Sequence, residues 1–370
     1  MKKIVSLILV CIYFLFLGIT ASAQNEEVQD SIYSDMFSSL NDETMQTLER
    51  FGFDHFDYGK MTELSPKDFV SYFLKILQGK IEGPVKMFLI ILSIIMIVSA
   101  AFSYFPDNEN RKQMLATCSC VIVALITARS VFPLIKGAMS VIDMTSKFIF
   151  TLLPILAGLI ASCRNPVMAV SMNSVSIYIA NIISLFANKY LTPFMSIFFA
   201  VSCVGCISNQ LDLKELSSFI KNTVIKILSV TASFYISFLS IKGLFSNSVD
   251  TVTSKGVKLI ISSAIPVIGS SLSEAYFALS GSLTLLKNTV GIIGIIIIVV
   301  INAPMIIELF IWTFLLSLAV IFCKTLSVNT ISSFLDSVVC VLKTLNIILI
   351  FCVSLLIISI GLMITIRSGS

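Results

Sequence analysis

The chain has 370 residues, of which 56% are hydrophobic and 12% are charged, and its formal net charge is +4. Soluble domains carry about 25% charged residues, so this composition excludes an ordinary soluble fold and indicates an integral membrane protein. The small net charge is spread along the chain and gives no basic surface for nucleic acid. We therefore expect an all-α, polytopic helical protein in contact with the lipid bilayer, with no nucleic acid partner.

The sequence also argues against an enzyme. The patterns GxxxxGK[ST], HExxH and GxSxG are absent from it, and His55 is the only histidine. The neighbouring Asp54 and Asp57 do not complete a metal site, because such sites need three or four converging ligands. We expect no catalytic residue, no cofactor and no bound metal.

The N-terminus has the pattern of a secretory signal peptide. Two lysines precede an apolar run over residues 4–19, and Ala21 and Ala23 then provide the small-x-small site of signal peptidase. We predict a signal peptide over residues 1–23, cleaved before Gln24. An uncleaved anchor is the alternative, since the apolar run is near the upper length of such a region. In both cases the residues that follow lie outside the cytoplasm.

Residues 24–84 form the one long polar segment, and its first half is acidic. Ser65 followed by Pro66 predicts the start of a helix, since serine caps helices and proline favours their first position. About 60 residues is little for an independent core. We expect an extracytoplasmic segment of short helices that lie on the membrane or on a partner, followed by a multi-span domain over residues 85–370.

The apolar runs of this second domain predict seven to nine membrane segments. The first follows Gly83-Pro84, and a later one is interrupted by Pro154 and Gly158. Arg129 lies in the second segment, where it either snorkels to the interface or acts as a functional charge. Outside the stretch 243–323, the predicted segments are residues 85–105, 114–134, 148–161, 167–187, 191–207, 224–244 and 338–366.

The stretch 243–323 combines long aliphatic runs with proline, glycine, serine and charge. Free backbone groups and ions are costly in hydrocarbon and persist only where protein or water covers them. We expect helices broken by Pro and Gly here, and either a single crossing or a fold-back at Asn302. Lys287 and Glu308 either form structural interhelical ion pairs or belong to an ion or proton relay. The candidate polar core comprises Pro154, Pro266, Gly269, Lys287, Asn288, Asn302, Pro304 and Glu308.

An internal repeat is a further hypothesis. Ile135-Lys136-Gly137 followed by Pro154 recurs as Ile241-Lys242-Gly243 followed by Pro266. Repeated broken helices build the midplane sites of many transporters. Chance similarity between low-complexity membrane sequences is the alternative.

Three strings resemble a known family. They are Leu-Pro-Ile-Leu-Ala-Gly-Leu-Ile-Ala-Ser at 153–162, Ile-Pro-Val-Ile-Gly at 265–269 and Leu-Leu-Lys-Asn-Thr-Val-Gly at 285–291. Together with the signal peptide and the acidic segment, they resemble stage III sporulation protein AE of endospore-forming Firmicutes over essentially the whole chain.

The resemblance implies a membrane subunit of the channel- or export-like complex that links mother cell and forespore and supports late forespore gene expression. The implied partners are the other proteins of the stage III sporulation A operon (an ATPase, ring-forming proteins and small membrane subunits) and, through them, a forespore membrane protein. The implied location is the mother-cell-derived membrane around the forespore. Two alternatives stay open: an autonomous secondary transporter for a small solute, and a scaffold whose small residues only pack helices.

Overall fold

A computed structural model describes residues 44–45, 66–104, 109–162, 182, 189, 192–205, 215, 218–235, 237 and 269–365. These residues are helical apart from short turns and contain no strand, which confirms the prediction of an all-α chain. A further helical stretch covers residues 218–235. The long elements are α5 (Pro66–Tyr104), α6 (Glu109–Ser162), α8 (Thr192–Val204), α10 (Gly269–Thr325) and α11 (Asn329–Thr365).

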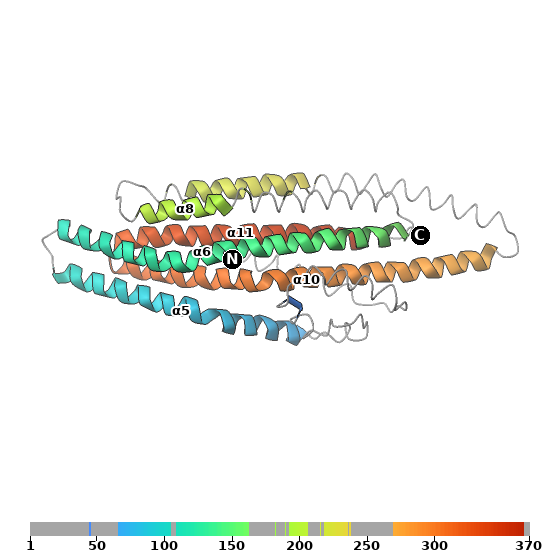
Figure 1. Ribbon diagram of the computed structural model, residues 1–370, viewed down its shortest axis with the longest axis horizontal. Coiled ribbons are helices and arrows are strands. Elements are labelled where there is room, and N and C mark those ends of the chain that lie inside the picture. Colours follow the sequence, from blue (N-terminus) through green and yellow to red (C-terminus); the bar gives the residue numbers. More distant parts are fainter. Residues whose placement is uncertain are drawn as a thin grey trace.

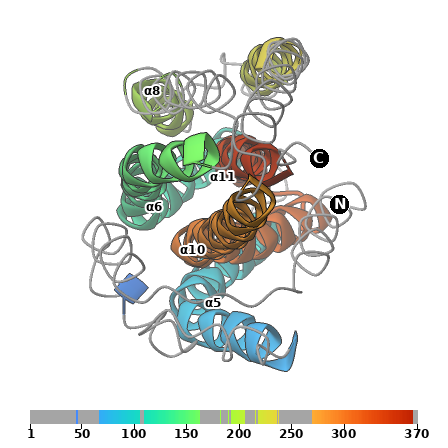
Figure 2. The same ribbon diagram turned by 90° about the vertical axis from the view of Figure 1, so that its right-hand side faces the viewer.

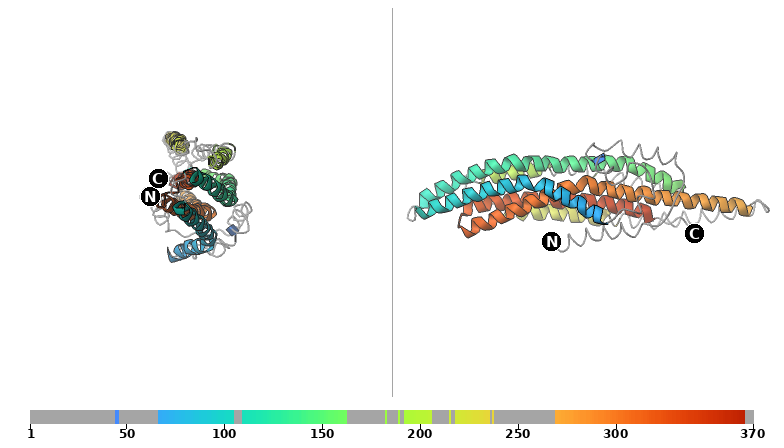
Figure 3. Two further views of the ribbon diagram at one scale, coloured as in Figure 1. Left: turned by 90° about the vertical axis from the view of Figure 1, so that its left-hand side faces the viewer. Right: turned by 90° about the horizontal axis from the view of Figure 1, so that it is seen from below.

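The helices lie along one axis and form an elongated bundle (Figures 1 and 3). α10 is the central helix and packs against α5, α6 and α11. α8 and residues 218–235 lie on the side of α6 and α11 that faces away from α5 (Figure 2). A hydrogen bond from the Tyr235 hydroxyl to the Leu355 carbonyl, at 3.3 Å, attaches residues 218–235 to α11.

α5 begins at Pro66, as the Ser65-Pro66 pair predicts. It then continues without interruption through Gly83 and Pro84, where we expected a new helix to begin. A proline inside a helix costs about 3 kcal/mol, but Pro84 is buried against the bundle. Packing of Pro84 against the bundle therefore accompanies one continuous helix.

The prediction of broken helices is wrong for the described residues. α6 is continuous through Pro133 and Pro154, and α10 is continuous through Pro304. Membrane helices tolerate proline where neighbouring helices and Ser or Thr side chains satisfy the freed backbone groups. Around Pro154, the side chains of Leu152, Leu153 and Leu156 are fully buried, so packing outweighs the lost hydrogen bond. For the same reason α10 does not fold back at Asn302.

The expected seven to nine membrane segments are not found among the described residues. Four helices are long and apolar enough to cross a membrane, which supports a membrane protein: Ser71–Tyr104, Glu109–Ser162, Thr284–Thr325 and Asn329–Gly361. The segments expected at 114–134 and 148–161 are parts of the single helix α6. The broken helix expected in the first copy of the repeat is absent, and the second copy lies outside the described residues. The repeat therefore has no support here.

A tight turn joins α10 to α11. Ser327 has a left-handed backbone, with φ of 57°. The amide of Val328 donates to the Cys323 carbonyl at 2.9 Å, and that of Ser327 donates to the Lys324 carbonyl at 3.2 Å. This pair of bonds is the Schellman cap of a helix, in which glycine usually takes the left-handed position. Val328 and Cys323 are fully buried, so an apolar contact closes the cap.

Candidate functional site: a polar layer in the helix bundle

One buried hydrogen bond links α10 to α6 in the interior of the bundle. The side chain of Asn302 is 1% exposed, and its Nδ2 donates to Thr145 Oγ1 and to the Ile298 carbonyl, both at 2.8 Å. Thr145 in turn donates to the Val141 carbonyl at 2.8 Å. Leaving a buried amide without a hydrogen bond costs about 1–3 kcal/mol. If α10 slid along α6, Asn302 would lose Thr145, so this hydrogen bond stabilises one register of the two helices.

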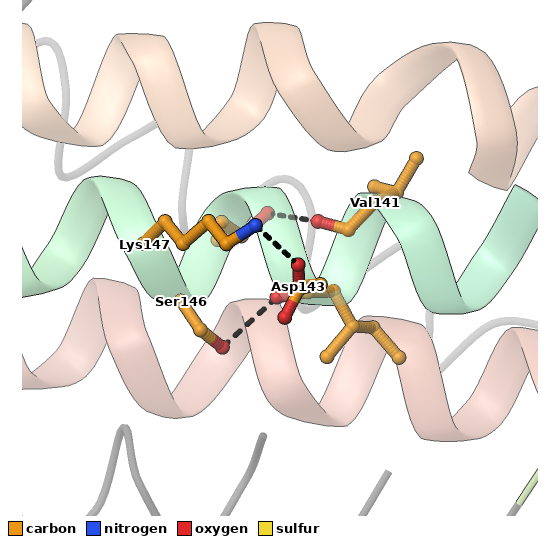
Figure 4. A network of polar contacts seen from close by, with 6 residues as sticks. Val141, Asp143, Ser146 and Lys147 are labelled. Atoms are coloured by element: carbon orange, nitrogen blue, oxygen red, sulfur yellow. Dashed lines mark hydrogen bonds and ion pairs between the residues drawn. The ribbon is translucent and has the colours of Figure 1, made fainter. Parts of the chain in front are cut away.

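The same turn of α6 is polar on its outer side (Figure 4). Lys147 Nζ lies 2.9 Å from Asp143 Oδ2, and both side chains are well exposed. Ser146 is buried and donates to the Ile142 carbonyl at 2.9 Å. An exposed pair with this spacing contributes little stability. The pair places two charged side chains on the exposed face of this turn.

α5 is attached to α10 by two contacts. Lys80 Nζ lies 2.9 Å from Glu308 Oε2, with the two side chains 42% and 24% exposed. The hydroxyl of Tyr72 donates to the Val300 carbonyl at 3.3 Å. Both contacts have a sequence offset of 228 residues, so α5 and α10 run parallel in constant register. Glu308 is thus in an interhelical ion pair, with Lys80 as a partner that the sequence did not indicate.

Lys287 and Glu308 do not belong to one site. Both lie on α10, and the 21 positions between them correspond to about 30 Å along a helix. Lys287 is 2% exposed and makes a polar interaction of its own. The neighbouring Asn288 has a buried Oδ1 without a hydrogen bond. A relay that passes directly between Lys287 and Glu308 is therefore excluded by distance.

The other members of the candidate polar core are also dispersed. Pro154 is exposed on α6, and Pro304 is half-buried one turn from Glu308. Gly269 is the first residue of α10. Pro266 and the cleavage-site residues Ala21, Ala23 and Gln24 lie outside the described residues. Only Asn302, Pro304 and Glu308 come together, on two turns of α10.

Glycines allow α10 to approach its neighbours closely. A Cβ on Gly294 would lie 2.5 Å from Leu152 Cδ2 on α6, and a Cβ on Gly291 would collide with Ile364 on α11. On α6, a Cβ at Gly137 would lie 3.3 Å from the sulfur of Met305. Small residues at such contacts let membrane helices pack closely. Gly291, which ends the family-like string at 285–291, thus lies at a close contact between α10 and α11.

Comparison with known proteins identifies the family. The family model described as "Stage III sporulation protein AE" matches residues 54–367. The chain belongs to the stage III sporulation protein AE family. A curated relative, "Stage III sporulation protein AE" of Bacillus subtilis (strain 168), is 26% identical over 259 residues. That alignment covers 70% of this chain and 64% of the relative. No solved structure matches the chain.

Within this AE-family chain, the described residues contain no group of three or more His, Cys, Asp or Glu side chains that could hold a metal ion. The polar contacts instead join helices in pairs: Asn302 to α6 and Glu308 to α5. Such an arrangement positions helices and presents charge at one level of the bundle.

Sequence reasoning missed three residues of this layer: Tyr72, Lys80 and Thr145. Tyr72 and Lys80 are eight positions apart, which places them on one face of a helix, and this spacing was the available signal. Their partners on α10 are far away in the sequence and leave no local trace. Thr145 was inconspicuous because a threonine in a helix commonly bonds only its own backbone.

Proposed function

We propose that this chain is a non-enzymatic membrane subunit of a channel- or export-like complex that links mother cell and forespore. In this role it is required for late forespore gene expression and endospore formation. The match of the sporulation family to residues 54–367 carries the proposal. The four apolar helices support a place in a membrane.

The partners in this proposal are the other proteins of the stage III sporulation A operon, including an ATPase, ring-forming proteins and small membrane subunits. Through them the chain connects to a forespore membrane protein. The sequence has no phosphate-binding GxxxxGK[ST] pattern, so energy comes from the ATPase partner or from a gradient. The membrane is the mother-cell-derived one around the forespore, with the N-terminal segment on its extracytoplasmic side.

The alternative of an autonomous transporter loses its main argument. It placed a midplane site near Pro154, Pro266 and Glu308, built by helices broken at proline. α6 and α10 are continuous at Pro154 and Pro304, and Pro304 lies about 25 Å along α10 from Lys287.

Deletion of the gene in its native host tests the proposal. We expect loss of heat-resistant spores and of late forespore reporter expression after engulfment, with both restored by the wild-type chain. Normal sporulation of the deletion strain would overturn the proposal. Uptake of a solute by the purified chain alone in liposomes would favour the transporter.

A pair of glutamate variants sharpens this experiment. Glu308→Gln removes the charge that faces Lys80 across two helices. Glu82→Gln is the matched control, because Glu82 pairs only with Lys86 on its own helix and both side chains are more than two-thirds exposed. If the charge at Glu308 serves transport, Glu82→Gln restores sporulation and Glu308→Gln does not, although both proteins accumulate normally.

A further inference from the structure

The lengths of α6 and α10 set a limit on how they sit in a membrane. They have 54 and 57 residues, which at 1.5 Å per residue is about 80 and 85 Å. The hydrocarbon core of a bilayer is about 30 Å thick. More than half of each helix must therefore lie outside a single bilayer. The positions of charged and exposed apolar side chains along the bundle indicate which part of each helix lies inside it.

Contacts between helices show which of their residues lie at the same height along the long axis of the bundle, which we call a level. Lys80 meets Glu308, which aligns α5 with α10. Gly137 lies against Met305, which brings Lys136 to the level of Glu308. Lys324 pairs with Asp336 at 2.8 Å and aligns α11.

Two charged levels follow from this alignment. The middle charged level occupies about two turns of each helix and contains Lys80, Glu82, Lys86, Arg129, Lys136, Glu308 and Lys343. The end charged level lies where the helices turn back and contains Glu109, Arg111, Lys112, Lys324 and Asp336.

On the fourth long helix, α11, only residues 337–342, about 9 Å, separate Asp336 from Lys343. Between the two levels, the other three helices have no charged residue: 87–104 of α5, 113–128 of α6 and 309–323 of α10. We name these stretches the belt. At 1.5 Å per residue they are about 27, 24 and 23 Å long. Large apolar side chains point outward from them, each 40–75% exposed: Leu89, Ile90, Met96, Ile97, Met114, Ile122, Leu125, Phe310, Phe314, Ile321 and Phe322.

Beyond the middle charged level the surface is different. We name this part the stalk: residues 143–162 of α6, 284–305 of α10 and 346–361 of α11. Apart from the buried Asn302, Thr145 and Lys287, its interior is largely apolar, and α10 is buried on nearly all sides. On these three stretches, Ile358 is the one described large apolar residue exposed by more than 40%, although Leu74 on α5 and Phe234 beside Tyr235 are exposed at the same level, at 53% and 78%. The apolar side chains of the three stalk stretches themselves are therefore mostly covered by protein.

Charged side chains also lie on the outside at the level of the stalk. Lys147 and Asp143 are exposed beside the turn of α6 that contacts Asn302. Lys75 is exposed on α5 close to Tyr72, which contacts Val300. A bilayer around the stalk would place these charges in hydrocarbon, at a cost of about 2.5–3.5 kcal/mol each.

We propose that the bilayer surrounds the belt, and that the stalk projects from the membrane on the side from which α5 enters. The partner of the exposed belt is the acyl-chain layer of phospholipid. The ends of the three uncharged stretches differ in level by about 10 Å. Helix tilt accommodates such a difference, and Lys and Arg side chains at the middle level extend to the headgroups. This placement does not depend on the proposed role in sporulation.

The single tryptophan of the chain, Trp312, makes the proposal directly testable. In a Trp312→Phe background, two variants add one tryptophan each at exposed positions. Phe314→Trp places it in the belt, where Phe314 is 56% exposed, and Ile358→Trp places it in the stalk, where Ile358 is 41% exposed. The purified full chain is reconstituted in phosphatidylcholine vesicles with brominated or ordinary acyl chains.

We expect brominated lipid to remove most of the emission of the Phe314→Trp variant and little of that of the Ile358→Trp variant, with iodide in water giving the opposite order. Ile97→Trp, at a position 69% exposed on α5, is a second belt probe if the first variant does not fold. Stronger bromine quenching at position 358 would place the bilayer on the stalk. Equal quenching of belt and stalk probes would also overturn the proposal.

Discussion

α5 and α10 run side by side and are both strongly apolar, yet their surroundings are opposite. In the most apolar part of α5, 22% of the residues are buried inside the protein, whereas in that of α10 the share is 67%. Hydropathy does not separate these two situations, because lipid and a protein interior are equally apolar solvents for a side chain. The difference lies in what stands next to each helix, and substitutions of the same chemistry in the two environments measure it.

The largest difference is expected for phenylalanine truncations. Phe148, in the stalk, is fully buried, and Phe314, in the belt, is 56% exposed. Phe148→Ala leaves a cavity and should destabilise the protein by about 3–5 kcal/mol. Phe314→Ala changes a surface position and should alter the free energy of unfolding by no more than about 0.5 kcal/mol. Thermal unfolding of the purified variants in detergent compares the two, and equal shifts would remove the contrast between belt and stalk.

Glycine substitutions give the next largest effect. In Gly294→Val the new side chain meets Leu152, which is fully buried and has little room to move. Such overpacking should cost about 1–3 kcal/mol. Gly158→Val is the matched control on α6, since no atom lies within 4 Å of a Cβ there. In the same unfolding assay, the control should be as stable as the wild type. A loss of stability in both variants would mean that the change in helix propensity, and not the close contact with Leu152, causes the effect.

The smallest effects separate the two cross-helix polar contacts. A double-mutant cycle of Asn302→Leu and Thr145→Val should give a coupling of about 0.5–1.5 kcal/mol that does not change with salt. The corresponding cycle of Lys80→Met and Glu308→Gln should give at most about 1 kcal/mol.

Since the Lys80–Glu308 pair is partly exposed, its coupling should also fall as ionic strength rises. Unfolding in detergent at low and high NaCl tests both cycles. A salt-sensitive Asn302–Thr145 coupling would contradict the buried geometry.

Local patterns predicted the local features of this fold. Composition identified the all-α membrane class, and Ser65-Pro66 located the start of α5 at Pro66. The family strings also pointed to the family that the comparison confirms over residues 54–367. Each of these signals can be read from the chain without knowing which segments pack together.

Features that depend on packing between distant segments were predicted poorly. Proline at positions 154 and 304 suggested helix ends, but α6 and α10 continue because their neighbours are packed on both sides. Glu308 was selected as an embedded charge, while its partner Lys80 was assigned to a polar segment outside the membrane domain. Nothing in a single sequence records that these two helices are neighbours.

The parallel register of α5 on α10 has a consequence for biogenesis. Tyr72 leaves the ribosome 228 residues before its partner Val300, which at about 5–20 residues per second is a delay of roughly 10–45 s. Throughout that interval the nascent α5 has no α10 to bind. Tyr72 and Lys80 must therefore be solvated by other groups until α10 has been made.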